Sequence, residues 1–556
     1  MTKRLPIFAS LVAGLILAIT FPPISQSDAA WFAFVPLLLS LRHATMKRGA
    51  LFGWLFGFAF GLVDLAWLWQ LKNNGGPLPL VIFGHVALAA WCALFAGLFG
   101  MAVAWLWNRP EITSRRLGQA ALALLAEPLL WVGSEYLRGI LFTGFAWNPL
   151  AASQYQNPAL LSCISRFGAG TLSFLIVAVN SSIALLLYRI WQDEFAPRFA
   201  RSIVTDNAKP KRHRFRAAEL LVVLLILFNS WSGGIASLHA DARRVLPSWR
   251  IALVHPDAPC IFERDGESVQ QACDDLLDYT ALAGSTRIDL CLWPETSLPG
   301  MMPYTQACFE MALYAASKTY APLIAGGIEL EEGSDEKDSR LYNSAYLFDK
   351  RGALAKRYDK RHLVPFGEYI PLESKLPFLK RLAPAGFSCE AGKEPTLLRI
   401  ERDEPTNDAR ETAPLLLAPL ICFEDTFPYL AREGAESGAT LLATLANDAW
   451  FDGSSEPEQH LAQAVLRCVE NGRPMVRSTN RGVTCFIDHR GRILRRIGNG
   501  RGAGSPGFLV HALGVDPSPK KTTYTRFGDW LLHIPALVFL GGVLLAAGIQ
   551  KRRRAS

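Results

Sequence analysis

The sequence predicts a polytopic α-helical membrane domain of about eight spans and a layered α/β domain outside the membrane. Half of the 556 residues are hydrophobic, and the long apolar stretches gather near the two ends of the chain. Between them, short strand-like segments alternate with amphipathic helical ones, which is typical of layered α/β domains. We therefore expect a membrane domain over 1–236, a catalytic α/β domain over 237–520, and a last transmembrane helix with a basic tail over 521–556.

Eight apolar stretches are candidate membrane spans. A helix needs about 20 apolar residues to cross a hydrocarbon core of about 30 Å. The candidate spans are 6–22, 29–41, 50–70, 79–107, 118–137, 160–188, 217–233 and 529–548. The first two are short, and prolines interrupt them.

The charges of the loops predict the orientation in the membrane. With the N-terminus in the cytoplasm, 20 basic residues fall on that side, and only Lys72 and Arg138 lie in the short outer loops. The region 240–525 has a net charge of −6 and the rest of the chain has +14. The basic character therefore belongs to the cytoplasmic loops, and the sequence does not indicate a nucleic-acid partner.

Three chemically different side chains follow strand-like segments of the outer domain. Glu295 follows Leu-Cys-Leu-Trp-Pro, Lys360 follows Ala-Lys-Arg-Tyr-Asp, and Cys422 follows Leu-Leu-Leu-Ala-Pro-Leu-Ile. A thiolate can hold an acyl group as a thioester, a carboxylate can take the proton of the thiol, and a fixed ammonium can stabilise an oxyanion. Taken singly, each has an ordinary structural interpretation, since a cysteine at a strand end is usually a small core residue.

Further residues are expected to support this set. Glu368 would orient Lys360, and the backbone N–H of Phe423 would be a second oxyanion donor. Glu424 would either do the same as Glu368 or hold the turn. His460 is interpreted as a helix residue packed under the site rather than as a base.

Several segments between about 248 and 515 resemble the nitrilase superfamily. These segments are WPET, YDKRHLVPFGEYIP, ICFED and ATLANDAWFDGSSEPEQH. The resemblance implies an αββα sandwich with Glu295, Lys360 and Cys422 as its catalytic triad. Together with the spans on both sides, the chain is similar to the membrane-embedded N-acyltransferase branch of that superfamily. It departs from the branch at Phe423, where tyrosine is usual, and at Phe262, where tryptophan is usual.

The resemblance also implies a reaction. The branch transfers an acyl chain from a glycerophospholipid, through a cysteine thioester, to the α-amino group of the diacylglyceryl-cysteine of an apolipoprotein. It implies a multi-pass protein of the bacterial inner membrane with a periplasmic catalytic domain, cytoplasmic termini, and no metal or organic cofactor. We expect Phe262 to contact the donor lipid, and Phe378 and Leu379 to admit its acyl chains.

Two alternatives remain open at this point. A membrane-tethered carbon–nitrogen hydrolase would have the same triad and would use water as the acceptor. A transport or scaffold bundle would carry an inactive domain, and it would retain its function in Cys422→Ala. In the membrane part, Asp64, Glu135 and Arg138 are either functional or structural, because intramembrane charges are costly. The ten cysteines show no metal spacing, and their pairing cannot be deduced.

Overall fold

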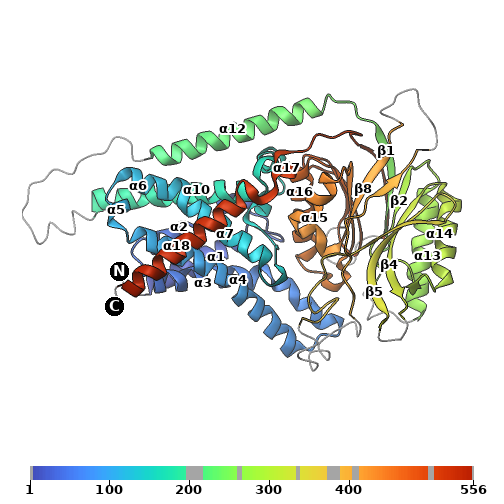
Figure 1. Ribbon diagram of the computed structural model, residues 1–556, viewed down its shortest axis with the longest axis horizontal. Helices are drawn as coiled ribbons and strands as arrows, with labels where there is room; N and C mark the ends of the chain where they lie inside the picture. Colours follow the sequence, from blue (N-terminus) through green and yellow to red (C-terminus); the bar gives the residue numbers. More distant parts are fainter. Residues whose placement is uncertain are drawn as a thin grey trace, which may run out of the picture. The chain divides into compact units, whose positions relative to one another are not determined.

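The computed structural model describes residues 4–195, 217–258, 266–333, 338–371, 388–402, 412–498 and 506–553 (Figure 1). The described residues form two compact units. The helical unit comprises those within Met1–Ala66, Ile82–Ser237 and Asp529–Ser556, and the α/β unit those within Trp67–Val81 and Leu238–Gly528. The short segment Trp67–Val81 therefore groups with the α/β unit although it precedes it by more than a hundred residues in sequence. The expected domain limits stay predictions.

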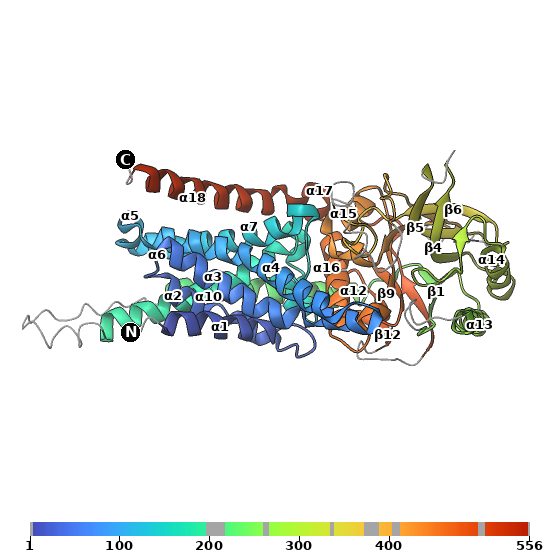
Figure 2. The same ribbon diagram turned by 90° about the horizontal axis from the view of Figure 1, so that it is seen from below.

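The helical unit is a bundle of apolar helices (Figure 2). Its main helices are α1 (Leu5–Ala18), α2 (Val35–Leu41), α3 (Met46–Asp64), α4 (Leu78–Trp107), α6 (Arg116–Ala121), α7 (Glu127–Ile140), α10 (Gly170–Ile190), α12 (Ala218–Asp241) and α18 (His533–Arg553). Among the described residues, five helices are long and apolar enough to cross a membrane, or six if the bent pair Met46–Asp64 and Ala66–Asn74 is one span. The first two candidate spans are the shorter apolar helices Leu5–Ala18 and Ser27–Leu41. The count of eight spans stays a prediction.

Helices α3 and α4 approach closely through glycine. Gly49 and Gly53 lie four residues apart on α3, so they share one face of the helix. A Cβ atom at Gly53 would lie 2.1 Å from the carbonyl oxygen of Ala96, and one at Gly49 would lie 2.5 Å from that of Gly100. Small residues at such contacts let helix backbones pack in a membrane, where no hydrophobic effect drives the helices together.

The α/β unit contains two β-sheets. The first consists of β1 (Ser248–His255), β2 (Leu290–Leu292), β3 (Met301–Met302), β4 (Leu323–Glu331), β5 (Arg340–Phe348), β6 (Leu354–Asp359) and β13 (Gly507–Gly514), in the order β13-β1-β2-β4-β5-β6 with β3 against β4. The second consists of β7 (Leu398–Ile400), β8 (Leu415–Ile421), β9 (Leu441–Asn447), β10 (Met475–Asn480), β11 (Thr484–Ile487) and β12 (Ile493–Ile497), in the order β12-β11-β10-β9-β8-β7.

Helices cover the outer face of each sheet (Figure 1). The first sheet is covered by α13 (Gly266–Ala283) and α14 (Gln306–Thr319), and the second by α15 (Pro428–Glu436) and α16 (Glu456–Asn471). Leu253 and Ile324 of the first sheet and Leu417 of the second share one buried cluster between the sheets. The strands are apolar on both faces because a helix layer and a second sheet enclose them. The expected αββα sandwich is confirmed.

Candidate active site

The three candidate catalytic residues follow the ends of strands, as the sequence predicts. β2 runs parallel to β1 and β4, and β8 runs parallel to β9. Glu295 follows β2, Lys360 directly follows β6, and Cys422 directly follows β8. The carboxyl ends of parallel strands meet at one edge of a sheet, and that edge is where α/β folds commonly build their sites.

Lys360 lies between two carboxylates. Its Nζ is 2.9 Å from Oε1 of Glu368 and 3.6 Å from Oε1 of Glu295, and its side chain is only 1% exposed. Burial lowers the pKa of Lys360, but the carboxylates of Glu368 and Glu295 outweigh that effect and raise it above its usual value. The ammonium therefore stays charged in a buried position.

Asn343 on β5 holds both carboxylates in place. Its Nδ2 donates hydrogen bonds to Oε1 of Glu295, at 2.7 Å, and to Oε1 of Glu368, at 2.8 Å. The second oxygen of Glu368 accepts the backbone N–H of Val364 at 2.8 Å. The sequence gives little indication of this role for Asn343. β5 also contains the polar residues Arg340 and Ser344, so a further polar residue in this strand has many ordinary explanations.

The Cys422 thiol begins a tight turn and interacts with Glu295. A 3-10 turn spans Cys422–Thr426, and Cys422 itself has a φ of +50°. The side chain is half-buried, and the thiol is free. Burial and the nearby carboxylate of Glu295 raise the pKa of Cys422 well above its usual value, while Lys360 opposes the rise. The thiol is therefore protonated at rest, so an attack on a carbonyl requires a base.

Glu295 is suited to be that base. Burial raises the pKa of Glu295, while the ammonium of Lys360 lowers it, and the carboxylate forms a hydrogen bond with Cys422. A raised pKa increases the affinity of a carboxylate for a proton, which brings a general base closer to neutral pH. The structure thus brings together a thiol, a base in contact with it, and a fixed positive charge.

Gly326 on β4 allows Glu295 to reach this position. A Cβ atom there would lie 2.6 Å from Cα of Glu295 and 2.6 Å from the carbonyl oxygen of Pro294. The two segments are joined by a hydrogen bond of 3.1 Å from the N–H of Gly326 to that same carbonyl oxygen. Both contacts involve backbone atoms, which cannot move away as a side-chain end can.

Gly326→Ala is expected to slow acyl transfer by about 10²-fold, because a shift near 1 Å in a catalytic group costs about that much. The measurement is the initial rate of acyl transfer by the purified variant. Gly266→Ala is the matched control, since a Cβ atom at Gly266 meets no atom within 4 Å. Equal rates for the two variants would contradict the claim that this contact positions Glu295.

Glu424 connects the turn of Cys422 to the loop of Lys360. Its carboxylate accepts the hydroxyl of Tyr358 at 2.9 Å and the backbone N–H groups of Ile421, at 2.7 Å, and Arg361, at 2.7 Å. It also accepts the N–H of His362 at 3.1 Å. With its lone pairs engaged by these donors, Glu424 holds the site together. Of the two expected roles for Glu424, the structure favours that of holding the turn.

Glu424→Ala is expected to lower the free energy of unfolding by at least about 3 kcal/mol, because several buried donors lose a charged acceptor. Thermal unfolding of the purified protein measures the change. Glu433→Ala is the control: Glu433 pairs with Arg361 but is 35% exposed, so we expect a loss of at most about 1 kcal/mol. Losses of the same size in both variants would contradict the bridging role.

The structure describes only some of the other residues predicted to support the site. The Phe423 ring packs against Phe427, with a centroid distance of 5.0 Å, and the role of its backbone N–H as an oxyanion donor stays a prediction. Three candidate lipid-contacting residues, Phe262, Phe378 and Leu379, lie outside the described residues. No disulfide joins the nine cysteines that the structure describes, and Cys260 is not among them.

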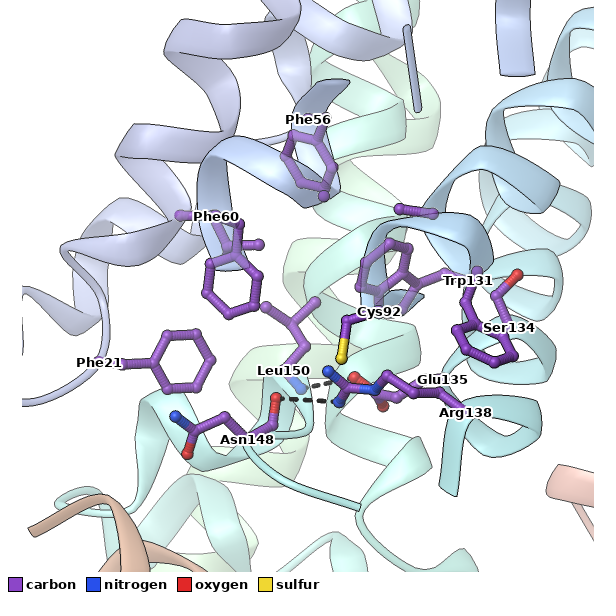
Figure 3. Close-up of a pocket in the computed structure, with 14 residues that line it drawn as sticks. Phe21, Phe56, Phe60, Cys92, Trp131, Ser134, Glu135, Arg138, Asn148 and Leu150 are labelled. Atoms are coloured by element: carbon purple, nitrogen blue, oxygen red, sulfur yellow. Dashed lines mark hydrogen bonds between the residues drawn. The ribbon is translucent and has the colours of Figure 1, made fainter. Parts of the chain in front are cut away.

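The charged residues of the membrane helices hold a loop (Figure 3). Glu135 accepts the N–H of Leu150 at 2.6 Å, and Arg138 donates to the carbonyl oxygen of Trp147 at 2.7 Å. Asp64 accepts from Nδ2 of Asn148 at 2.8 Å. Glu135, Arg138 and Asn148 line a cavity of about 40 Å³, which has room for a few water molecules only. These contacts favour the structural interpretation of the three charges.

An αββα sandwich with Glu295, Lys360 and Cys422 after the ends of its strands defines a domain of the carbon–nitrogen hydrolase class. The family model for carbon–nitrogen hydrolases matches residues 260–503, and that for the apolipoprotein N-acyltransferase N-terminal domain matches residues 13–182. The apolipoprotein N-acyltransferase of Geobacter metallireducens is 30% identical, over 98% of this chain and 95% of its own length. That of Azotobacter vinelandii is 31% identical, over 98% and 95%. The chain belongs to the apolipoprotein N-acyltransferase family.

Among solved structures, about half of the chain is similar to a mutant of an amidase of the nitrilase superfamily from Nesterenkonia. The identity is 20%, the match covers 52% of this chain and 98% of the amidase chain, and the TM-score is 0.36.

Proposed function

We propose that the protein transfers an acyl chain from a glycerophospholipid to the α-amino group of the N-terminal diacylglyceryl-cysteine of an apolipoprotein. The observation that carries this proposal is the contact of the Cys422 thiol with Glu295, beside the buried ammonium of Lys360, in a chain of this family. The helices that are long and apolar enough to cross a membrane also support the proposal, because both substrates carry lipid chains.

In the first step, Sγ of Cys422 attacks the ester carbonyl carbon of the phospholipid. Glu295 takes the proton of the thiol as the carbon–sulfur bond forms. The carbon–oxygen bond of the ester then breaks, and the proton passes from Glu295 to the leaving glycerol oxygen. A lysophospholipid departs, and the acyl chain remains on Cys422 as a thioester.

Charge that develops on the carbonyl oxygen needs a donor already in place. Lys360 is buried and fixed by Glu368, so it does not have to reorganise during the reaction. The backbone N–H of Phe423 is the second donor in this proposal, because the residue after a nucleophile at a strand end commonly has that role. Glu368 and Asn343 act as positioning residues, since they touch Lys360 and Glu295.

In the second step, the amine of the lipoprotein attacks the thioester. Glu295 takes a proton from the attacking amine, an amide bond forms, and the thiol of Cys422 leaves with that proton. The enzyme returns to its starting state without any cofactor. The same residues would transfer the acyl group to water in a carbon–nitrogen hydrolase, so the acceptor distinguishes the two functions.

We also propose a bacterial inner-membrane location with the α/β unit in the periplasm and both termini in the cytoplasm. The charge of the loops supports this orientation, since 20 basic residues fall on the cytoplasmic side. Cysteine labelling with an impermeant reagent at engineered positions in the loops would test it. Labelling of the 240–525 region only after the membrane is opened would contradict it.

The test of the proposed function is a reconstitution of the purified full-length protein with a phospholipid and a synthetic diacylated lipopeptide. The proposal expects the triacylated peptide and a lysophospholipid in equal amounts, detected by mass spectrometry. Free fatty acid and an unchanged peptide would instead favour the hydrolase. Neither product, from protein that is folded, would favour a bundle without catalytic activity.

A further inference from the structure

A buried ion-pair cluster lies directly beneath the turn of Cys422, and His460 on α16 is at its centre. The Nδ1 atom of His460 is 3.1 Å from Oδ1 of Asp448. Its Nε2 atom is 3.2 Å from the carbonyl oxygen of Cys422 and 2.9 Å from Oδ1 of Asp425. The side chains of His460, Asp425 and Asp448 are at most 1% exposed.

Both ring nitrogens of His460 therefore face oxygen acceptors. A neutral imidazole has a single N–H, so it can donate from only one nitrogen, and its other nitrogen would meet a carboxylate or a carbonyl lone pair. Only the imidazolium form satisfies both contacts. Neither neutral tautomer can donate from both nitrogens, so the geometry requires a positively charged ring.

The other charged groups of the cluster agree with a charged His460. Arg477 on β10 is 2.5 Å from Oδ2 of Asp425 and 3.2 Å from Oδ2 of Asp448. Its single positive charge balances the negative charge of one of these two carboxylates. Glu456 on α16 lies 3.5 Å from Nδ1, and burial together with Asp448 raises the pKa of Glu456 well above its usual value. With Glu456 neutral, two carboxylates face two cations.

The pKa of His460 follows from the same neighbours. Burial and the charge of Arg477 lower it, but Asp425 and Asp448 outweigh both and raise it to about 10. The spacing of Asp448, Glu456 and His460 also resembles that of metal ligands. A charged imidazolium and the guanidinium of Arg477 already neutralise these carboxylates, so the cluster is better described as an ion-pair network.

The contact with Cys422 matters because the backbone there is strained. A φ of +50° is unusual for a residue other than glycine; it costs about 1–3 kcal/mol and persists only where neighbouring groups hold it. The carbonyl oxygen of Cys422 is held by His460, and the N–H of Ile421 before it is held by Glu424. The turn that presents the thiol is thus fixed from both sides.

We propose that His460 is a permanently charged positioning residue, whose Nε2–H holds the Cys422 carbonyl oxygen and with it the turn that presents Sγ to the acyl donor. It does not touch the substrate and does not exchange a proton during the reaction. This inference rests on the proposed role of Cys422 as the nucleophile.

The test compares His460→Gln with the wild-type enzyme. The readout is the rate at which phospholipid acylates Cys422, followed by intact-protein mass spectrometry between pH 5.5 and 8.5. We expect the pH-independent maximum of the acylation rate to fall by about 10²-fold, as it does when a reacting atom is misplaced. The fall of the rate at acidic pH should keep the same midpoint, because Glu295 determines it. The proposal would be overturned if His460→Gln had the maximum acylation rate of the wild type, or if its rate no longer fell at acidic pH.

A second substitution separates charge pairing from packing. In His460→Gln, Arg477 is the one remaining cation that pairs with Asp425 and Asp448 among the described residues, so adding Asp448→Asn removes the surplus negative charge. We expect Cys422 to be acylated about tenfold faster in this double variant than in His460→Gln. A purely steric role would leave it as slow as His460→Gln or make it slower, and that result would contradict a charged His460.

His489→Gln is the matched control. His489 lies in a turn where it contacts Asp241, and its side chain is 24% exposed. Its rate should equal that of the wild type. If His460→Gln does not fold, the pH dependence of hydrogen exchange at the ring C2 of His460 in the wild type decides the matter. The proposal expects no titration between pH 5.5 and 8.5, and an inflection there would overturn it.

The outcomes also distinguish this inference from the proposed function. A wild-type enzyme that forms no adduct on Cys422 would contradict the proposed function. An adduct that forms equally well with and without His460 would contradict only the inference.

Discussion

Cys422→Ala is expected to reduce acyl transfer by at least about 10⁴-fold, the scale seen when an enzyme loses its nucleophile. Without the thiol no covalent intermediate can form, and the amine would have to attack the phospholipid ester directly. The measurement is the steady-state rate of triacylated peptide formation. Cys422 is only partly buried at the edge of the core, and alanine removes a single sulfur atom, so we expect the variant to fold.

Cys273→Ala is the control for this substitution. Cys273 lies on α13, on the outer face of the first sheet, and is half-buried like Cys422. Its removal should leave the rate unchanged. A Cys422→Ala variant that retains a substantial fraction of the wild-type rate would remove the thioester from the mechanism and favour a bundle whose α/β unit is inactive.

Glu295→Gln is expected to reduce the rate of acyl-enzyme formation by about 10³-fold, within the range for general-base catalysis. It should also change the pH dependence. In the wild type the rate rises with pH through the pKa of Glu295, which burial raises, and is constant above it. In the variant no base is present, so the rate should keep rising toward the pKa of Cys422, which is well above the usual value.

Single-turnover measurements between pH 5.5 and 9 would follow both changes. Glu267→Gln, an exposed substitution at the start of α13, is the matched control and should behave as the wild type. A Glu295→Gln variant that retains the wild-type plateau would show that another group takes the proton of the thiol.

Much of the fold could be predicted because its signals are local. The apolar segment before Cys422 forms the strand Leu415–Ile421, as expected, and His460 lies on a helix, Glu456–Asn471, as expected. The strand ends with Glu295, Lys360 and Cys422 were equally visible, since each residue directly follows its strand or lies within three residues of it.

The supporting groups of the site could not be predicted in the same way. Asn343 is 48 residues from Glu295, and His460 is 38 residues from Cys422, so only the folded sheets bring them together. Likewise, Trp67–Val81 lies between membrane helices in sequence, and Asn74 nevertheless donates to the carbonyl oxygen of Trp450 in the α/β unit at 2.6 Å. No periodicity or spacing indicates such contacts.

The number of membrane spans could not be predicted for a different reason. Composition identifies apolar stretches, but it does not say how much of each becomes one helix. The stretch 6–22 yields α1, a helix of 14 residues, and 29–41 yields α2, a helix of seven. Pro6 and Pro36 lie in the first turn of α1 and of α2, where a missing backbone N–H is tolerated. Pro22 and Pro23 follow the end of α1, so the helix does not continue through the whole apolar stretch.

The most direct test of the central claim is intact-protein mass spectrometry of the full-length protein after incubation with phospholipid and no acceptor. The proposed mechanism predicts a mass increase of one acyl chain that maps to Cys422, is removed by hydroxylamine, is absent in Cys422→Ala and is discharged by a diacylated lipopeptide. Folded protein that releases lysophospholipid without ever carrying the acyl chain on Cys422 would contradict it.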